Sequence, residues 1–253
     1  MHPIERLRYV ARATDAPGEA VLREAAASLA GFADDPAALV TACRRLVDRH
    51  PANGPVWWLA ARLLTATDPV AAAAESVELV DADRTLRELA DALPVDARAC
   101  VVGWPPRLAD AFARRGDVEV RVVDVEGDGP GFVRLLEDVD VQALDIDVTG
   151  LGGAASSADV VVVDASAIGP EVAITPAGSW PLAAVARAAS VPVWLVGGVG
   201  RRVGPGTWPA LFDRLVGGAT APWDGGVDRL PLALVDRTFG VDGPVVEAPE
   251  LRR

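Results

Sequence analysis

A run of four consecutive valines, residues 160–163, constrains the fold of this chain more than any other feature. Small residues follow it as far as Ile168, and an Ala-rich segment then leads to a second apolar run, Val193–Val196. Uninterrupted β-branched runs are typical of strands that are buried on both faces, as in parallel sheets. The segment 158–196 is therefore predicted to form a parallel βαβ unit, and its strand-end loops are where α/β proteins place ligands.

The same alternation of apolar runs and helical segments extends from Arg98 onward. Strands separated by helices throughout indicate a parallel sheet with right-handed crossovers. We therefore predict an α/β fold in which a Rossmann-like parallel-sheet domain occupies residues 94–253. Strands are expected over 99–102, 118–125, 141–148, 160–163 and 193–196, with a weak sixth strand near 232–235.

Residues 1–93 have a different pattern and are predicted to form a helical domain. Apolar residues recur there at helical spacing, and Asp-Pro and Asn-Gly-Pro sequences mark turns and helix starts. Helices are expected over 3–10, 19–32, 56–65 and 69–93, with another that begins at Asp35-Pro36.

The composition excludes several functional classes. The formal net charge is −12, and all 24 basic residues are arginines. This acidity argues against a nucleic-acid-binding protein, which would present a basic face. No uncharged apolar stretch reaches the about 18 residues that a membrane span needs, and the amino end lacks a signal-peptide core. We therefore expect a cytoplasmic protein with no nucleic-acid or membrane partner.

The metal-binding residue types are few and isolated. Cys43 and Cys100 have no CxxC spacing and lie in apolar segments, which is typical of buried, unreactive thiols. The two histidines, His2 and His50, are too few for a zinc site. We expect neither a metal nor a cofactor.

Three short segments carry a family resemblance. Residues 162–168, VVDASAI, are similar to a "VVGADAI" sequence, and residues 178–183, GSWPLA, to "GTYQLA". Residues 101–105, VVGWP, stand where relatives read "THSWS" or "THCNS". On these segments the chain resembles the translation initiation factor 2B alpha/beta/delta-like family over roughly residues 45–205. That family includes the methylthioribose-1-phosphate and ribose-1,5-bisphosphate isomerases.

The resemblance implies a sheet domain of the NagB/RpiA/CoA-transferase type and a homodimer that pairs through it. It also implies a phosphorylated small molecule as ligand. The isomerases react through a cysteine and an aspartate, a pair that can shuttle a proton between sugar carbons. The positions of this cysteine and this aspartate align with Gly103 and Ser166 here. The chain therefore resembles a divergent member of the family. Asp164 lies two residues before Ser166, on the same face of an extended segment, and is the candidate catalytic carboxylate.

The expected ligand site comprises the loops after the strands. Where the family has an Asn-Lys sequence, this chain has Thr175-Pro176-Ala177, so a charged donor is missing. The Gly-rich segment 197–200 and the two arginines after it offer amides and charge to a phosphate, although a surface loop with solvated arginines fits the pattern equally. The predicted ligand-binding residues are Gly103, Trp104, Ser166, Gly178, Ser179, Arg201 and Arg202.

Two further carboxylates, Asp145 and Asp147, alternate with apolar residues at the end of a predicted strand. They fit either a Mg²⁺ or acid/base site or a helix cap.

Three functions remain open at this point. The first is a non-catalytic relative of the isomerases that binds a phosphorylated metabolite or acts as a scaffold. The second is an active aldose–ketose isomerase on a ribose phosphate derivative that uses Asp164, and the third is a pure protein-interaction subunit.

Overall fold

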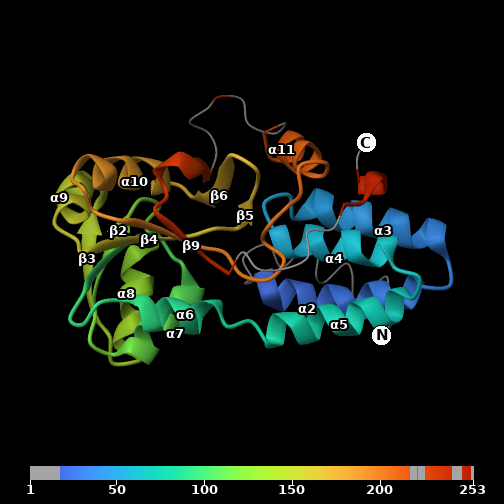
Figure 1. The fold of residues 1–253 in the computed structure, drawn as a ribbon, viewed down its shortest axis with the longest axis horizontal. Helices are drawn as coiled ribbons and strands as arrows, with labels where there is room; N and C mark the ends of the chain where they lie inside the picture. The colour runs from blue at the N-terminus through green and yellow to red at the C-terminus, as the bar shows by residue number, and fades with distance from the viewer. Residues whose placement is uncertain (1–17, 217–220, 222–225, 241–246, 252–253) are drawn as a thin grey trace.

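The computed structural model describes residues 18–216, 221, 226–240 and 247–251. The helix expected over 3–10 lies outside these residues. The chain forms a helical layer beside a sheet that is covered on both faces, as Figure 1 shows. Within the described ranges, none of the helices combines the length and apolar character that a bilayer crossing requires.

Four helices make up the helical layer, and short sequence signals begin three of them. The side chains of Asp35, Asn53 and Asp68 each accept a backbone N–H from the first turn that follows, and a proline stands at the start of each helix. The helices are α2 (Gly18–Leu29), α3 (Pro36–Arg49), α4 (Gly54–Thr65) and α5 (Pro69–Asp81), with a 3-10 turn, η1 (Ala30–Phe32), after α2.

The most deeply buried helix of this layer is α4, whose residues Trp57 and Trp58 are almost inaccessible to solvent. Segments from the second half of the chain complete the same apolar core through Ile174, Leu211 and Leu251. The helical layer therefore takes residues from both ends of the sequence. The division into domains 1–93 and 94–253 stays a prediction.

The six-stranded sheet has the order β3-β2-β1-β4-β7-β9, and every pair in it is parallel. This is the doubly wound Rossmann order 3-2-1-4-5-6, so the predicted α/β fold is confirmed. The strands are β1 (Arg98–Val102), β2 (Glu119–Asp124), β3 (Gln142–Asp147), β4 (Val160–Asp164), β7 (Val193–Val196) and β9 (Arg237–Phe239). The sixth strand is thus five residues later than expected, because 232–234 form a 3-10 turn, η3 (Leu232–Leu234).

Helices cover both faces of this sheet, seen above and below it in Figure 1. One face packs against α6 (Thr85–Ala92), α7 (Pro106–Arg115) and α8 (Gly129–Glu137). The other packs against α9 (Leu151–Ser156) and α10 (Ser179–Ala188). The single helix expected over 69–93 is therefore two helices, and the second of them, α6, contributes Leu89 and Ala90 to the core of the sheet.

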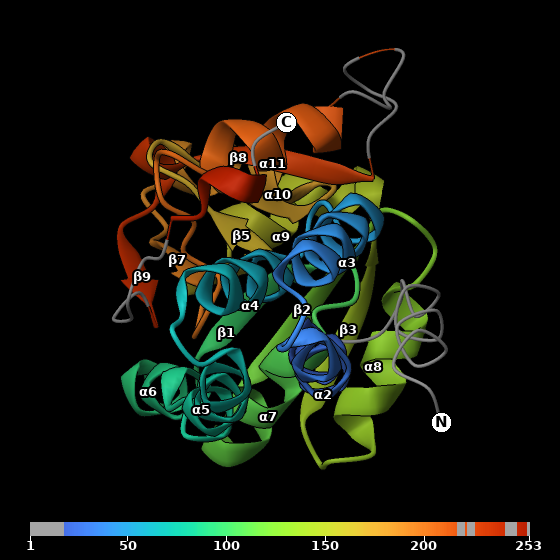
Figure 2. The same ribbon diagram turned by 90° about the vertical axis from the view of Figure 1, so that its right-hand side faces the viewer.

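A second, antiparallel sheet was not expected from the sequence. It has the order β5-β6-β8 and consists of β5 (Ala167–Ile168), β6 (Val172–Pro176) and β8 (Val227–Pro231). Thr175 and Pro176, predicted to lie in a ligand loop, belong to β6, where Thr175 is buried. Three further elements, η2 (Val148–Gly150), α11 (Trp208–Val216) and η4 (Pro249–Leu251), complete the described fold. Figure 2 shows the helical layer end-on.

Candidate functional site

The order of the sheet reverses between β1 and β4, which are neighbours at its centre. Ligands of open α/β sheets bind outside the carboxyl ends of the strands at such a switch point. Gly103 and Trp104 follow β1 there, and Asp164 is the last residue of β4. The structure thus brings these three predicted residues to the same end of the sheet.

Four charged side chains meet at this point, and we call them the strand-end network: Glu19, Arg107, Asp164 and Arg201. The Arg107 guanidinium bonds Asp164 through Nη2–Oδ1 at 2.7 Å and Nε–Oδ2 at 3.4 Å. Its Nη1 donates to Glu19 Oε1 at 2.9 Å, and Arg201 Nη2 donates to the same oxygen at 2.7 Å. Two cations and two carboxylates therefore neutralise one another within the chain.

The network also binds backbone groups and is shielded from water. Arg107 Nη2 donates to the Gly197 carbonyl at 2.6 Å, and Arg201 Nη1 to the Ala165 carbonyl at 2.6 Å. The four side chains are between 6% and 19% exposed. Among the described residues Arg201 Nε has no acceptor, which makes it the one unsatisfied nitrogen of the network. Buried charges of this kind persist because they are paired and hydrogen-bonded.

The ionisation of the network follows from its geometry. Burial opposes the charged form of Glu19, but Arg201 and Arg107 outweigh it and lower the pKa of this carboxyl from 4.5 to about 2. Burial also opposes the charged form of Arg107, and Asp164 and Glu19 more than compensate, so the pKa of Arg107 is raised. Glu19 and Arg107 are therefore held in their charged forms.

The Gly-rich segment 197–200 does not present its amides to an open space. The Gly197 amide donates to the Phe239 carbonyl at 3.0 Å, and the Gly198 amide to the Gly240 carbonyl at 3.1 Å. The Val199 amide donates to Asp83 Oδ2 at 2.8 Å. Three donors that a phosphate would need are thus already bound by the chain itself.

Arg201 and Arg202, predicted to act as a pair, lie in different environments. Arg201 is 5% exposed and belongs to the strand-end network, whereas Arg202 is exposed and lines a separate pocket. Neighbouring side chains in an extended segment point to opposite sides, which explains the separation.

The residues after β1 shape the rim of the site. Gly103 is buried with a φ of 65°, and its amide donates to the Val123 carbonyl at 3.0 Å. The indole ring of Trp104 packs against Gly131, where a Cβ would come within 2.1 Å of it. Its side chain is nonetheless 42% exposed, so an aromatic surface remains accessible beside the network.

The other predicted ligand residues have structural contacts. The Ser166 carbonyl accepts the Gly54 amide at 2.9 Å, which joins the start of α4 to the loop after β4. Gly178 has a φ of 89° and sits against Val102 and Val125. Ser179 is fully buried, and its hydroxyl has no partner among the described residues. A ligand role for these three residues stays a prediction.

Neither Cys100 nor the carboxylates at the end of β3 join this site. Burial raises the pKa of the Cys100 thiol to about 12. Asp147 Oδ1 accepts the Thr149 amide at 2.8 Å and the Thr149 hydroxyl at 2.6 Å, so Asp147 serves as a cap. Across the described part of the chain, no group of three or more His, Cys, Asp or Glu residues is arranged to hold a metal ion.

Glu19 and Arg107 are not among the site residues predicted from the sequence. Arg107 could have been found from the sequence for two reasons. It lies in the first turn of a helix, where a cation is unfavourable because it opposes the helix dipole, and that helix follows a strand at the switch point of the sheet. Glu19 had none, because it is 88 residues from Arg107 and 182 from Arg201.

No protein-family model matches the sequence, and neither does any curated protein. Solved structures do match it. Translation initiation factor eIF-2B from Pyrococcus horikoshii OT3 has 14% identity and a TM-score of 0.78, with 99% of this chain and 98% of that one covered.

Two structures from Chaetomium thermophilum are also similar. The eIF2B delta subunit has 13% identity and a TM-score of 0.71, with 96% of this chain and 98% of that one covered. A chain of the tetrameric eIF2B-beta2-delta2 complex has 14% identity and a TM-score of 0.70, with 94% and 88% covered. Over nearly its whole length, this chain therefore has the fold of the translation initiation factor 2B alpha/beta/delta-like subunits.

Proposed function

We propose that this chain is a divergent, non-catalytic member of the initiation factor 2B-like family that works as an assembly subunit. The observation that carries this proposal is the strand-end network, in which the candidate catalytic residue Asp164 is bound by Arg107 through both carboxylate oxygens. The shared fold supports the family, and the network supports the loss of ligand chemistry.

An aldose–ketose isomerase needs a group that takes up and returns a proton within reach of the substrate. The family positions for that chemistry carry Gly103 and Ser166 here. Asp164 is the remaining carboxylate, and Arg107 and Glu19 lie between it and Arg201. An active isomerase would have to open this ion pair to free Asp164, so we rank that alternative below the assembly subunit.

Metabolite binding meets the same obstacle. A phosphate dianion requires cationic or backbone donors to offset the loss of its hydration. Arg201 already serves Glu19, and the amides of Gly197 and Gly198 serve backbone carbonyls. Glu19 thus takes the place that an external anion would need.

The assembly surface that we infer lies along β3, an edge strand of the six-stranded sheet (Figure 1). Leu144 lies in β3, and Val139 and Val148 lie just before and just after the strand in the sequence; these residues are 45%, 42% and 46% exposed. An open strand edge with exposed apolar side chains is a template for pairing with another chain. We propose that a second copy of this chain covers it, which gives the homodimer through the sheet domain.

The experiment is light scattering coupled to gel filtration on three proteins at micromolar concentration. We expect the wild type to elute as a dimer and Leu144→Lys as a monomer, because a charge on the edge strand opposes pairing. Val70→Lys is the matched control. Val70 is 51% exposed, and it lies on α5 in the helical layer, not in the strand β3. A monomeric wild type, or equal behaviour of the two variants, contradicts this interface.

A further inference from the structure

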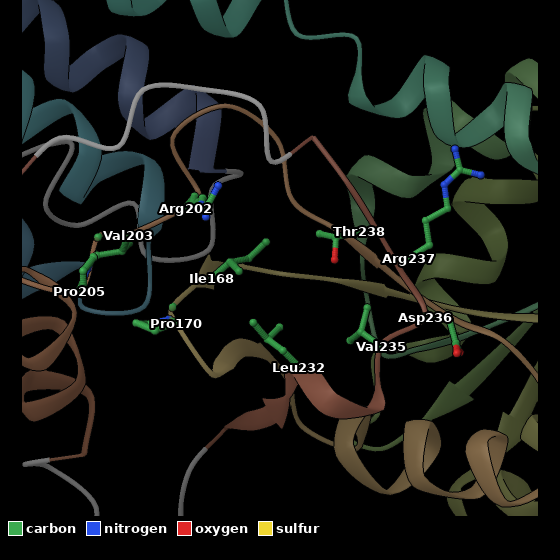
Figure 3. A pocket seen from close by; sticks show the side chains of 12 residues that line it. Ile168, Pro170, Arg202, Val203, Pro205, Leu232, Val235, Asp236, Arg237 and Thr238 are labelled. Carbon is green, nitrogen blue, oxygen red and sulfur yellow. The ribbon is translucent and has the colours of Figure 1, made fainter.

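A pocket of about 650 Å³ lies apart from the strand-end network. Its walls come from the first strand of the antiparallel sheet, β5, and the residues after it, from the segment after Arg201, from η3 with the residues after it, and from the edge strand β9. Figure 3 shows Ile168, Leu232, Val235 and Thr238 directed toward one shared space. This volume is within the range of about 300–1,000 Å³ that is typical of small-molecule sites.

The lining is aliphatic. Ile168, Val203, Leu232 and Val235 supply branched side chains, and Pro170 and Pro205 supply rings without π-electrons. None of the described residues that line the pocket is aromatic, so a planar base or ring would find no stacking partner. A flexible hydrocarbon chain matches such walls, because its burial depends only on apolar area.

The charge at the pocket is positive although the whole chain is acidic. Arg202 lines it, is exposed and has no carboxylate partner among the described residues. Asp236, the one acidic lining residue, is already used, since its carboxylate binds Arg187 and accepts the Val193 amide at 2.8 Å. Arg237 lies over the Phe239 ring at 4.3 Å and, in Figure 3, points away from the pocket.

One further polar group completes the site. The Thr238 side chain is directed toward the apolar walls, and its hydroxyl has no hydrogen-bond partner among the described residues. A hydroxyl can donate to an anion or accept from a hydroxyl group. The pocket thus combines one free guanidinium, one free hydroxyl and an aliphatic floor.

We propose that this pocket binds an aliphatic chain with a single anionic head, the chain against Ile168, Leu232 and Val235 and the head at Arg202. The head is a carboxylate or a phosphate monoester, both of which a guanidinium binds through two parallel hydrogen bonds. This inference does not rest on the proposed function, because none of the residues of the strand-end network lines the pocket.

Calorimetric titration with three eight-carbon probes tests the proposal: octanoate, octyl phosphate and octanol. We expect octanoate or octyl phosphate to bind at least tenfold more tightly than octanol, and the tighter of the two identifies the head group. Loss of a charge-assisted hydrogen bond should weaken anion binding about tenfold in Arg202→Gln. Arg45→Gln, on an exposed position of α3, should bind like the wild type.

A second variant tests the apolar part of the site independently. Leu232→Asp places a negative charge among the aliphatic walls and should abolish binding of both anions, while circular dichroism checks that the protein is folded. The proposal is overturned if the wild type binds none of the probes, or if octanol binds as tightly as octanoate and octyl phosphate. It is also overturned if Arg202→Gln binds the anions as the wild type does.

Discussion

Arg107 Nη2 lies 2.7 Å from Asp164 Oδ1, and Arg107 Nε lies 3.4 Å from Asp164 Oδ2. The two residues follow β1 and end β4, the pair of strands between which the sheet order reverses. Their ion pair therefore occupies the place where a doubly wound sheet would bind its ligand. Glu19 and Arg201 extend the pair, so the site carries four charges with a formal sum of zero.

Removal of Arg107 should destabilise the protein strongly. Arg107→Ala leaves Asp164 and Glu19 with fewer partners in a site that is mostly closed to water, which costs about 3–5 kcal/mol for a buried pair. Urea denaturation measures the loss. Arg98→Ala is the matched control, because Arg98 forms a similar ion pair with Asp159 on the surface and should leave the midpoint almost unchanged. Equal midpoints for the two variants contradict the stabilising role of the network.

Glu19 should make the stability of the fold depend on pH in a defined window. Its pKa is about 2 in the folded protein and 4.5 as the ordinary value, so the folded state binds the proton more weakly than the unfolded state does. The contribution is thus fully present above about pH 4.5 and is lost as the pH falls to 2, with a size of about 3 kcal/mol.

The measurement is the free energy of unfolding of the wild type and of Glu19→Gln between pH 7 and pH 2. We expect the wild type to be more stable at neutral pH and the difference between the two proteins to shrink as the pH falls. A difference that stays constant over this range means that Glu19 is not held ionised by Arg201 and Arg107.

The junction between α4 and the loop after β4 should not tolerate a side chain at Gly54. A Cβ there would lie 2.8 Å from the Ser166 carbonyl oxygen and 3.0 Å from Arg201 Cα, both of them backbone atoms. We expect Gly54→Ala to lower the free energy of unfolding by about 1–3 kcal/mol through overpacking. Gly152→Ala, in α9, meets no atom within 4 Å and should stabilise the protein by about 0.4–1 kcal/mol. Thermal unfolding of both variants measures these changes. A Gly54→Ala variant as stable as the wild type contradicts this close approach.

Neither cysteine should behave as a catalytic thiol. Burial raises the pKa of Cys43 and of Cys100 to about 12, whereas an exposed thiol titrates near 8.5. A disulfide reagent at pH 8 should therefore modify neither residue quickly in the folded protein and both in urea. Fast modification of one thiol in the native state contradicts this assignment.

The central strands could be predicted because each carries its signal locally. Residues 160–163 are all valine, and a strand buried on both faces needs such a continuous apolar run. The signals for the helix starts at Asp35 and Asp68 are equally local, because an acidic N-cap followed by proline favours the first turn of a helix. The break between α5 and α6 was overlooked although Asp83, whose side chain accepts the Thr85 amide, marks it.

The rest of the structure depends on partners that are distant in sequence. The strand β9 has only three residues, and β6 ends in proline, so neither shows a periodic pattern. Asp164 was correctly placed at a strand end, but its partner Arg107 is 57 residues away. The exposed Arg202 and the buried Arg201 are adjacent and identical in type, so only tertiary packing separates their roles.

The proposal that the strand-end network replaces a ligand is tested most directly by titrating the wild-type protein with ribose 1,5-bisphosphate and ribose 5-phosphate. NMR detects any ketose product. Because Glu19, Arg107, Asp164 and Arg201 neutralise one another, we predict neither binding at millimolar ligand nor product formation. Micromolar binding of either sugar phosphate, or its conversion to a ketose, contradicts the claim that this chain is a non-catalytic subunit with a self-filled site.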